Sequence, residues 1–84
     1  MAKIDKEKIF WRKVDDEIVV LNIGTGFYYS LDEIASFIWS RVAEDEAPEA
    51  IAAHLTETYE VDARTAQKDL KGVLEYFHKE GLIF

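Results

Sequence analysis

The sequence predicts an α+β domain of winged-helix-like arrangement: a three-stranded antiparallel meander followed by three helices. Three observations predict it. Short segments rich in β-branched and aromatic residues, separated by turn signals, fill residues 8–31. From there on, apolar residues recur at three- and four-residue steps. The later half also carries Pro48, Asp62 and Gly81 at positions typical of helix ends. We expect residues 1–84 to form a single domain.

The expected strands are residues 8–14, 17–23 and 27–31, separated by Asp15-Asp16 and by the hairpin turn Gly24-Thr25-Gly26. Tyr28 and Tyr29 of the third strand point to opposite faces. One is expected in the core and the other free for a ligand, and the sequence leaves open which. The third strand is the last of the meander. Its far edge is therefore open, either as an aggregation hazard or as a docking site.

The first helix is expected from about Leu31 to Ala43, with no loop between it and the third strand. Ser30 and Glu33 have the spacing of a capping box, in which each side chain bonds the other's backbone amide.

The other two helices have clearer ends. Pro48 suits the first position of the second helix, and Asp62 is a cap for a third helix that runs to roughly Lys79. Gly81 fits the position after that helix, with Leu82 as the hydrophobic contact of a Schellman motif. Residues 82–84 could then add a short strand.

Composition limits what the chain can do. A domain of 84 residues holds one modest core and no deep substrate cavity. We expect residues 1–7 to be flexible, and the protein to be cytoplasmic, because no signal peptide or membrane-length apolar run is present. The net charge of −7 disfavours nucleic acid as a partner.

No catalytic or metal-binding pattern stands out. The acidic runs at residues 15–17 and 44–46 lie in polar turns, where nothing would raise a carboxyl pKa for acid–base chemistry. The chain has no cysteine, and His54 and His78 belong to different expected helices. Trp39 and Phe77 lie among aliphatic residues at helical spacing, which is typical of core packing. The sequence therefore predicts a protein that is not an enzyme and has no cofactor or metal.

One ordered set of short patterns runs through most of the chain. Its members are Thr25-Gly26 before Tyr28-Tyr29, then Leu31, Ala35, Ile38-Trp39, Ile51, Leu55, Tyr59, Asp62, Asp69-Leu70, Val73-Leu74 and Gly81-Leu82-Ile83. In this order and spacing the chain resembles the PqqD-like family, the recognition elements that bind the leader of a ribosomally made precursor peptide. It is most similar to the free-standing leader-binding proteins of lasso-peptide pathways.

The resemblance implies a site. In such proteins the leader adds as a strand beside the third strand, in a groove whose other wall is the third helix. One flank of that helix carries Asp69, Val73 and Tyr76, and the opposite flank is basic. The first flank is favoured because the family has Asp at the position of Asp69, although a solvated surface role for this residue is the alternative. The expected peptide-binding residues are Phe27, Tyr28, Tyr29, Ser30, Leu31, Asp69, Val73 and Tyr76, with Lys68, Lys71 and Leu74 as secondary candidates.

The resemblance also implies partners: a precursor leader peptide and a maturation enzyme, with no membrane and no nucleic acid. A leader peptidase with a cyclase, as in lasso-peptide pathways, is favoured over a radical-SAM enzyme, as in pyrroloquinoline quinone synthesis. The alternative from a different class is a winged-helix DNA-binding protein. In that case Arg64, Gln67 and Lys68 would read bases from the third helix.

Overall fold

The predicted strands and their order are confirmed in the computed structural model, which describes residues 3–84. The strands are β1 (Ile9–Val14), β2 (Glu17–Asn22) and β3 (Phe27–Leu31), and they pair antiparallel in the order β1-β2-β3. The hairpin turn after β2 is held by Asn22, whose side-chain Oδ1 accepts from the Gly24 amide at 2.9 Å. The α+β class is likewise confirmed, since three helices follow the sheet.

The two faces of the sheet have different environments. The inner face packs on the helices and carries residues such as Ile18 and Val20, which are buried. The outer face carries the cross-strand row Phe10–Leu21–Tyr28, in which Phe10 is 53% and Tyr28 71% exposed. Strand alternation decides the question that the sequence left open: Tyr29 faces the helices and Tyr28 faces away from them.

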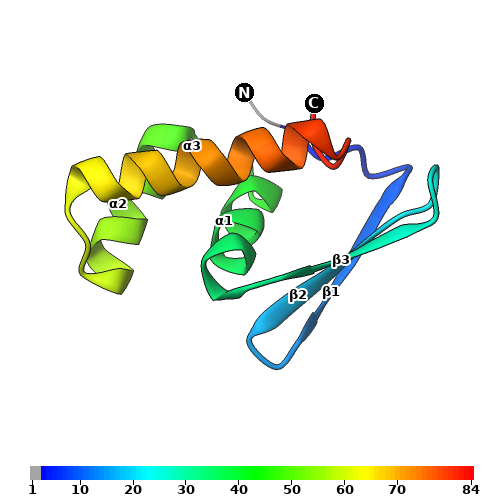
Figure 1. Cartoon of the computed structure of the whole chain (residues 1–84), viewed down its shortest axis with the longest axis horizontal. Helices are drawn as coiled ribbons and strands as arrows, with labels where there is room; N and C mark the ends of the chain where they lie inside the picture. The colour runs from blue at the N-terminus through cyan, green and yellow to red at the C-terminus, as the bar shows by residue number, and fades with distance from the viewer. Residues whose placement is uncertain (1–2) are drawn as a thin grey trace.

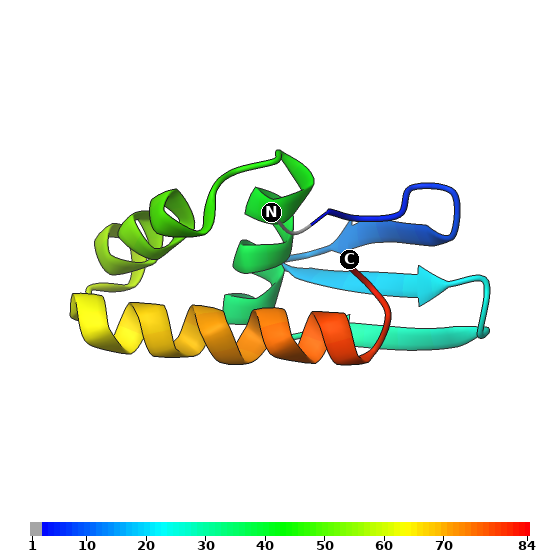
Figure 2. The same cartoon turned by 90° about the horizontal axis from the view of Figure 1, so that it is seen from above.

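The helices are α1 (Glu33–Ala43), α2 (Pro48–Tyr59) and α3 (Ala63–Lys79). In Figure 1, α1 stands between the sheet and α2, while α3 passes over α1 and α2. Figure 2 shows that the C-terminal half of α3 runs along the sheet on the side of β3. The candidate site lies in the space between this helix and the edge of β3.

The predicted start of the first helix and its capping box are wrong. Ser30 belongs to β3, and the helix begins two residues later than predicted, at Glu33. The cap is Asp32, whose side chain accepts from the Ala35 amide at 2.8 Å. Leu31 is held in the sheet opposite Ile18, so the chain leaves the extended conformation only at Asp32. A residue that is still part of a strand cannot cap a helix that starts three positions later.

Stability measurements distinguish the observed cap, Asp32, from the predicted cap, Ser30. We expect Asp32→Ala to lower the free energy of unfolding by about 1 kcal/mol, the usual effect of losing an N-cap side chain. Asp32→Asn should cost little, because asparagine caps about as well. Ser30→Ala should also have little effect, and urea unfolding of the three variants measures all of these changes. A larger loss for Ser30→Ala than for Asp32→Ala would contradict the cap seen here.

The end of α3 is the predicted Schellman motif. Gly81 has a φ of 73°, the amide of Leu82 donates to the Phe77 carbonyl at 2.9 Å, and the amide of Gly81 donates to the His78 carbonyl at 3.1 Å. Leu82 is fully buried, as the motif requires.

The two ends of the chain meet. Ile4 forms an isolated antiparallel bridge with Ile83, and Lys3 exchanges two backbone hydrogen bonds with Phe84. The predicted terminal strand is thus a single bridge. Flexibility of residues 1–7 stays a prediction, and its first two residues lie outside the described range. Ile4, however, is only 8% exposed, so the segment is anchored at that point.

The core contains Trp39 and Phe77 as predicted, both fully buried. Trp39 makes edge-to-face contacts with Trp11 and Phe77, at centroid distances of 5.6 and 5.2 Å. One tryptophan of α1 therefore joins β1 to α3.

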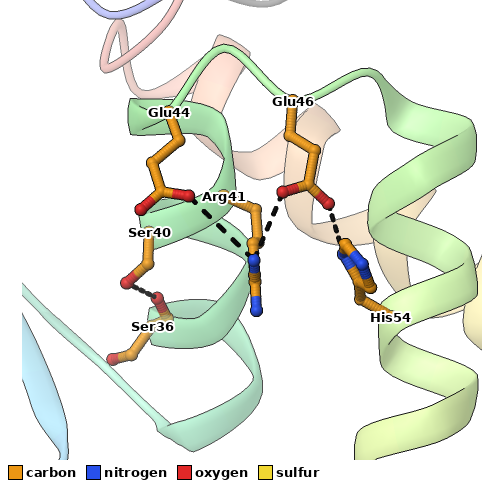
Figure 3. Close-up of polar contacts among 6 residues, drawn as sticks. All are labelled: Ser36, Ser40, Arg41, Glu44, Glu46 and His54. Atoms are coloured by element: carbon orange, nitrogen blue, oxygen red, sulfur yellow. Dashed lines mark hydrogen bonds and ion pairs between the residues drawn. The ribbon is translucent and has the colours of Figure 1, made fainter.

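Contacts between charged and polar side chains hold the loop between α1 and α2 in place. Arg41 Nη1 lies 3.4 Å from a carboxylate oxygen of Glu46, and the other oxygen of that carboxylate contacts His54 on α2 (Figure 3). The Glu46 side chain is only 17% exposed, so these partners offset the cost of burying its charge. The contacts set the position of α2 behind α1, away from β3.

Candidate functional site

The outer edge of β3 is unpaired: within residues 3–84, only β2 bonds to this strand. The amide of Ile23 donates to the Lys8 carbonyl on the β1 side. Because bonding directions alternate along an antiparallel strand, the even-numbered residues of β2 face β3. Their partners in register are Phe27, Tyr29 and Leu31. It follows that the N–H and C=O groups of Tyr28 and Ser30 point to the open edge.

A buried hydroxyl supports this assignment at the end of the strand. Ser36 of α1 accepts from the Ile18 amide at 2.9 Å and donates to the Leu31 carbonyl at 3.0 Å. Both of those backbone groups therefore point into the space between β2 and β3. The Ser36 hydroxyl thus stands in for a direct backbone hydrogen bond at this end of the β2–β3 pair. It also fixes α1 against the end of β3.

A groove of about 600 Å³ lies beside this end of β3. One wall is the end of β3 with the start of α1, and the other is one face of α3. The lining residues are Ser30, Leu31, Asp32, Ile34, Ala35, Lys68, Asp69, Gly72, Val73 and Tyr76. Apart from Lys68 and Asp69 near the N-terminal half of α3, the side chains from α1 and α3 are apolar or aromatic, which suits a ligand that presents apolar side chains.

Tyr29 links β3 to α3 at the other end. Its hydroxyl donates to Glu80 Oε1 at 3.1 Å, and its ring packs edge-to-face on Tyr76 at 6.4 Å. Loss of solvent around the hydroxyl raises the Tyr29 pKa above its usual value of 10.0, and the hydrogen bond to the Glu80 carboxylate raises it further. The tyrosine is therefore neutral at physiological pH and able to donate this bond.

The wall of the groove formed by α3 is positioned by the N-cap residue of that helix. The carboxylate of Asp62 accepts from the Thr65 amide at 2.7 Å, and this hydrogen bond lowers the Asp62 pKa below its usual value. An ionised Asp62 thus fixes the start of α3 throughout the neutral range. The cap sets where Lys68 and Asp69, both about two turns further on, stand relative to β3.

The structure places six of the eleven expected site residues in the groove lining, and two of the secondary candidates on another side of α3. Ser30, Leu31, Asp69, Val73 and Tyr76 line the groove, together with the secondary candidate Lys68. The structure places Lys71 and Leu74 on another side of α3, in a separate hollow against α2.

The aromatic residues at the start of β3 lie outside the groove lining. Phe27 is 62% exposed near the hairpin turn, Tyr28 is on the outer face of the sheet, and Tyr29 is half-buried. The ring of Tyr29 contacts a side chain that lines the groove, that of Tyr76. The open backbone edge, at Tyr28 and Ser30, and the groove, which Ser30 and Leu31 line, thus overlap at Ser30.

Four lining residues were not expected from the sequence: Asp32, Ile34, Ala35 and Gly72. Ile34 and Ala35 follow the apolar pattern of one helix face, and in the structure both are half-buried. Gly72 carried the one available signal, because glycine is unusual in a helix interior.

The sequence matches the family model described as coenzyme PQQ synthesis protein D (PqqD) over residues 17–83, from β2 to the C-terminal bridge. The chain belongs to the PqqD family. The resemblance drawn from the sequence is confirmed. No curated protein sequence matches the chain.

Two solved structures share the fold of this PqqD-family chain. TbiB1 in complex with the TbiA(beta) leader peptide has a TM-score of 0.91 and 34% sequence identity, covering 96% of this chain and 93% of that one. Lasso peptide synthetase B1 complexed with the leader peptide has a TM-score of 0.90 and 24% identity, covering 99% and 96%. At the second identity the likeness concerns the fold alone. No helix within residues 3–84 of this PqqD-family chain has the length and apolarity needed to cross a membrane.

Proposed function

We propose that the protein is a non-catalytic adaptor that binds the leader of a ribosomally synthesised precursor peptide and presents it to maturation enzymes. The leader adds as a strand to β3, with alternate side chains entering the groove against α3. The observation that carries this proposal is the unpaired edge of β3 beside a largely apolar groove. Family membership supports it, and the 34%-identical neighbour is a leader-peptide complex.

The balance of energies fits an adaptor. Tyr28 and Ser30 offer four backbone groups, and each hydrogen bond contributes about 0.5–1.5 kcal/mol net. Ordering a disordered leader costs roughly 2–5 kcal/mol, so the backbone ladder is largely offset. Affinity must come from apolar side chains buried in the groove. This arrangement lets one domain hold leaders of different sequence as long as they carry the right few anchors.

Maturation enzymes of the lasso-peptide type, a leader peptidase with a cyclase, are the favoured partners. The sequence is most similar to the leader-binding proteins of those pathways, and the 34%-identical neighbour TbiB1 is a leader-peptide complex. A radical-SAM enzyme is the second choice, in keeping with the family description. The DNA-binding alternative has less support. Asp69 lies in the groove beside Lys68, and the chain carries a net charge of −7, so a phosphate backbone would be repelled overall.

Hydrogen exchange tests the strand addition residue by residue. When a leader peptide that binds the protein is added, the amides of Tyr28 and Ser30 should gain protection. The amides of Tyr29 and Leu31 already face β2 and should change little. Protection confined to α3, with both edge amides unchanged, would contradict strand addition.

A proline variant tests the same edge through affinity. Ser30→Pro removes one outward N–H, at a position where an edge strand tolerates proline. We expect it to weaken binding by about 1 kcal/mol, roughly fivefold, through the lost hydrogen bond. Ser30→Ala is the matched control and should bind like the wild type. Circular dichroism confirms that both variants remain folded.

A further inference from the structure

Gly72 is the one glycine of this chain that lies within a helix, ten residues into α3 and on the face that lines the groove. Glycine is the least favourable helix-interior residue apart from proline, because it loses the most backbone freedom on folding. A residue that weakens the helix at this point calls for a local reason.

The folded domain itself supplies no such reason. Apart from its two chain neighbours and the nearby backbone of α3 itself, a Cβ at position 72 would meet no atom within 4 Å, and the backbone there does not adopt a positive φ. By contrast, Gly26 and Gly81 have φ values of 81° and 73°, which an L side chain rarely adopts. Position 72 therefore has open space and ordinary helical geometry, so an alanine would fit and would strengthen the helix.

The open space lies inside the groove. Lys68 is one turn before Gly72 and Tyr76 is one turn after it, so both side chains project from the same stripe of α3. Between them the missing side chain leaves a notch about two turns, roughly 11 Å, long. The opposite wall carries Ile34 and Ala35. The surroundings of the notch thus include hydrocarbon and aromatic side chains. The charged residues of the same lining are Lys68 and Asp69 on α3, and Asp32 at the start of α1.

We propose that Gly72 forms the floor of a subsite that takes one large apolar side chain, aromatic or branched, of the bound peptide. The absence of a side chain lets that residue approach the backbone of α3, while Tyr76 and Ile34 cover its sides. Gly72 thereby determines the size of the residue accepted at one peptide position. The inference rests on the proposed function and names the position that gives it selectivity.

Two substitutions separate a binding role from a helix effect. Gly72→Ala should raise the melting temperature by about 4–8 °C, since alanine is the better helix former. It should also weaken peptide binding by about three- to fivefold, because one methyl group fills part of the notch. Gly72→Leu should weaken binding at least tenfold. Gln67→Leu is the control, because Gln67 is exposed on α3 but lines the hollow against α2.

The probe is a display library of random 20-residue peptides, selected on the wild-type protein and separately on Gly72→Leu. Peptides selected on the wild type should share a large apolar residue at one fixed position. Those selected on Gly72→Leu should carry glycine, alanine or serine there, while Gln67→Leu should return the wild-type pattern. Unchanged affinity of wild-type-selected peptides for Gly72→Leu, or an unchanged pattern, would overturn the subsite.

The proposed function fails separately from this inference. If no selected peptide protects the amides of Tyr28 and Ser30 from exchange, then strand addition itself is wrong. If those amides are protected and Gly72→Leu binds like the wild type, then only the role of Gly72 is wrong.

Discussion

Trp39→Ala is expected to remove a large part of the free energy of unfolding at 25 °C. The side chain is fully buried and joins Trp11 of β1 to Phe77 of α3 through edge-to-face contacts. Replacing a buried tryptophan by alanine costs about 3–5 kcal/mol. A domain of 84 residues has a total stability of about 4–13 kcal/mol. The loss is therefore comparable to the lower end of the whole stability, and near-ultraviolet circular dichroism with urea titration measures it.

Trp39→Phe is the matched variant. The indole Nε1 is buried with no hydrogen-bond partner among the described residues. Phenylalanine removes this unsatisfied donor, which offsets part of the lost packing. We expect it to cost less than half of what alanine costs. Equal destabilisation by the two variants would mean that the indole nitrogen is satisfied in solution, for example by a bound water.

The strands, α2 and α3 could be predicted from the sequence because their signals are local. Pro48, Asp62 and Gly81 each fix a helix end through the conformation or hydrogen bonds of one or two neighbouring residues. The predicted cap of α1, Ser30, lies two residues before the observed cap, Asp32. The choice between them depends on how far β3 pairs with β2, a contact between distant parts of the chain. Sequence spacing alone carries no information on that pairing.

The candidate site, like the fold, could be predicted where it depends on local signals and not where it depends on contacts between distant parts of the chain. The open edge of β3 could be predicted, because it follows from the order of strands in a meander. The groove needed the placement of α3 against β3, which no local pattern specifies. Family resemblance indicated the flank of Asp69 and Val73, but the separation of Lys71 and Leu74 into another hollow required the fold. Gly72 was overlooked because its role depends on empty space, which a sequence does not display.

Contacts within the domain hold both walls of the groove in place. Ser36 fixes the end of β3, and the Tyr29–Glu80 hydrogen bond ties that strand to the C-terminal end of α3. Both walls of the groove are thus held in place before a peptide arrives. A preformed groove lowers the ordering cost to that of the peptide alone.

Selectivity is expected to lie in a few apolar leader side chains. If the leader adds as a strand to β3, as proposed, every peptide offers the same backbone to Tyr28 and Ser30. Only side chains that enter the groove could then distinguish one leader from another. Burying one such side chain is worth about 1.5–3 kcal/mol, roughly ten- to hundredfold in affinity. Truncating a leader anchor to alanine should therefore weaken binding by that amount.

Leader charges should matter much less. Reversing one exposed leader charge is expected to cost under about 1 kcal/mol, because exposed ion pairs are screened by water and salt. An alanine and charge-reversal scan of the leader, read by fluorescence polarisation, compares the two effects directly. If charge reversals dominated and apolar truncations were silent, recognition would be electrostatic. Lys68 and Asp69, the two charges of α3 that line the groove, would then be the residues that select the leader.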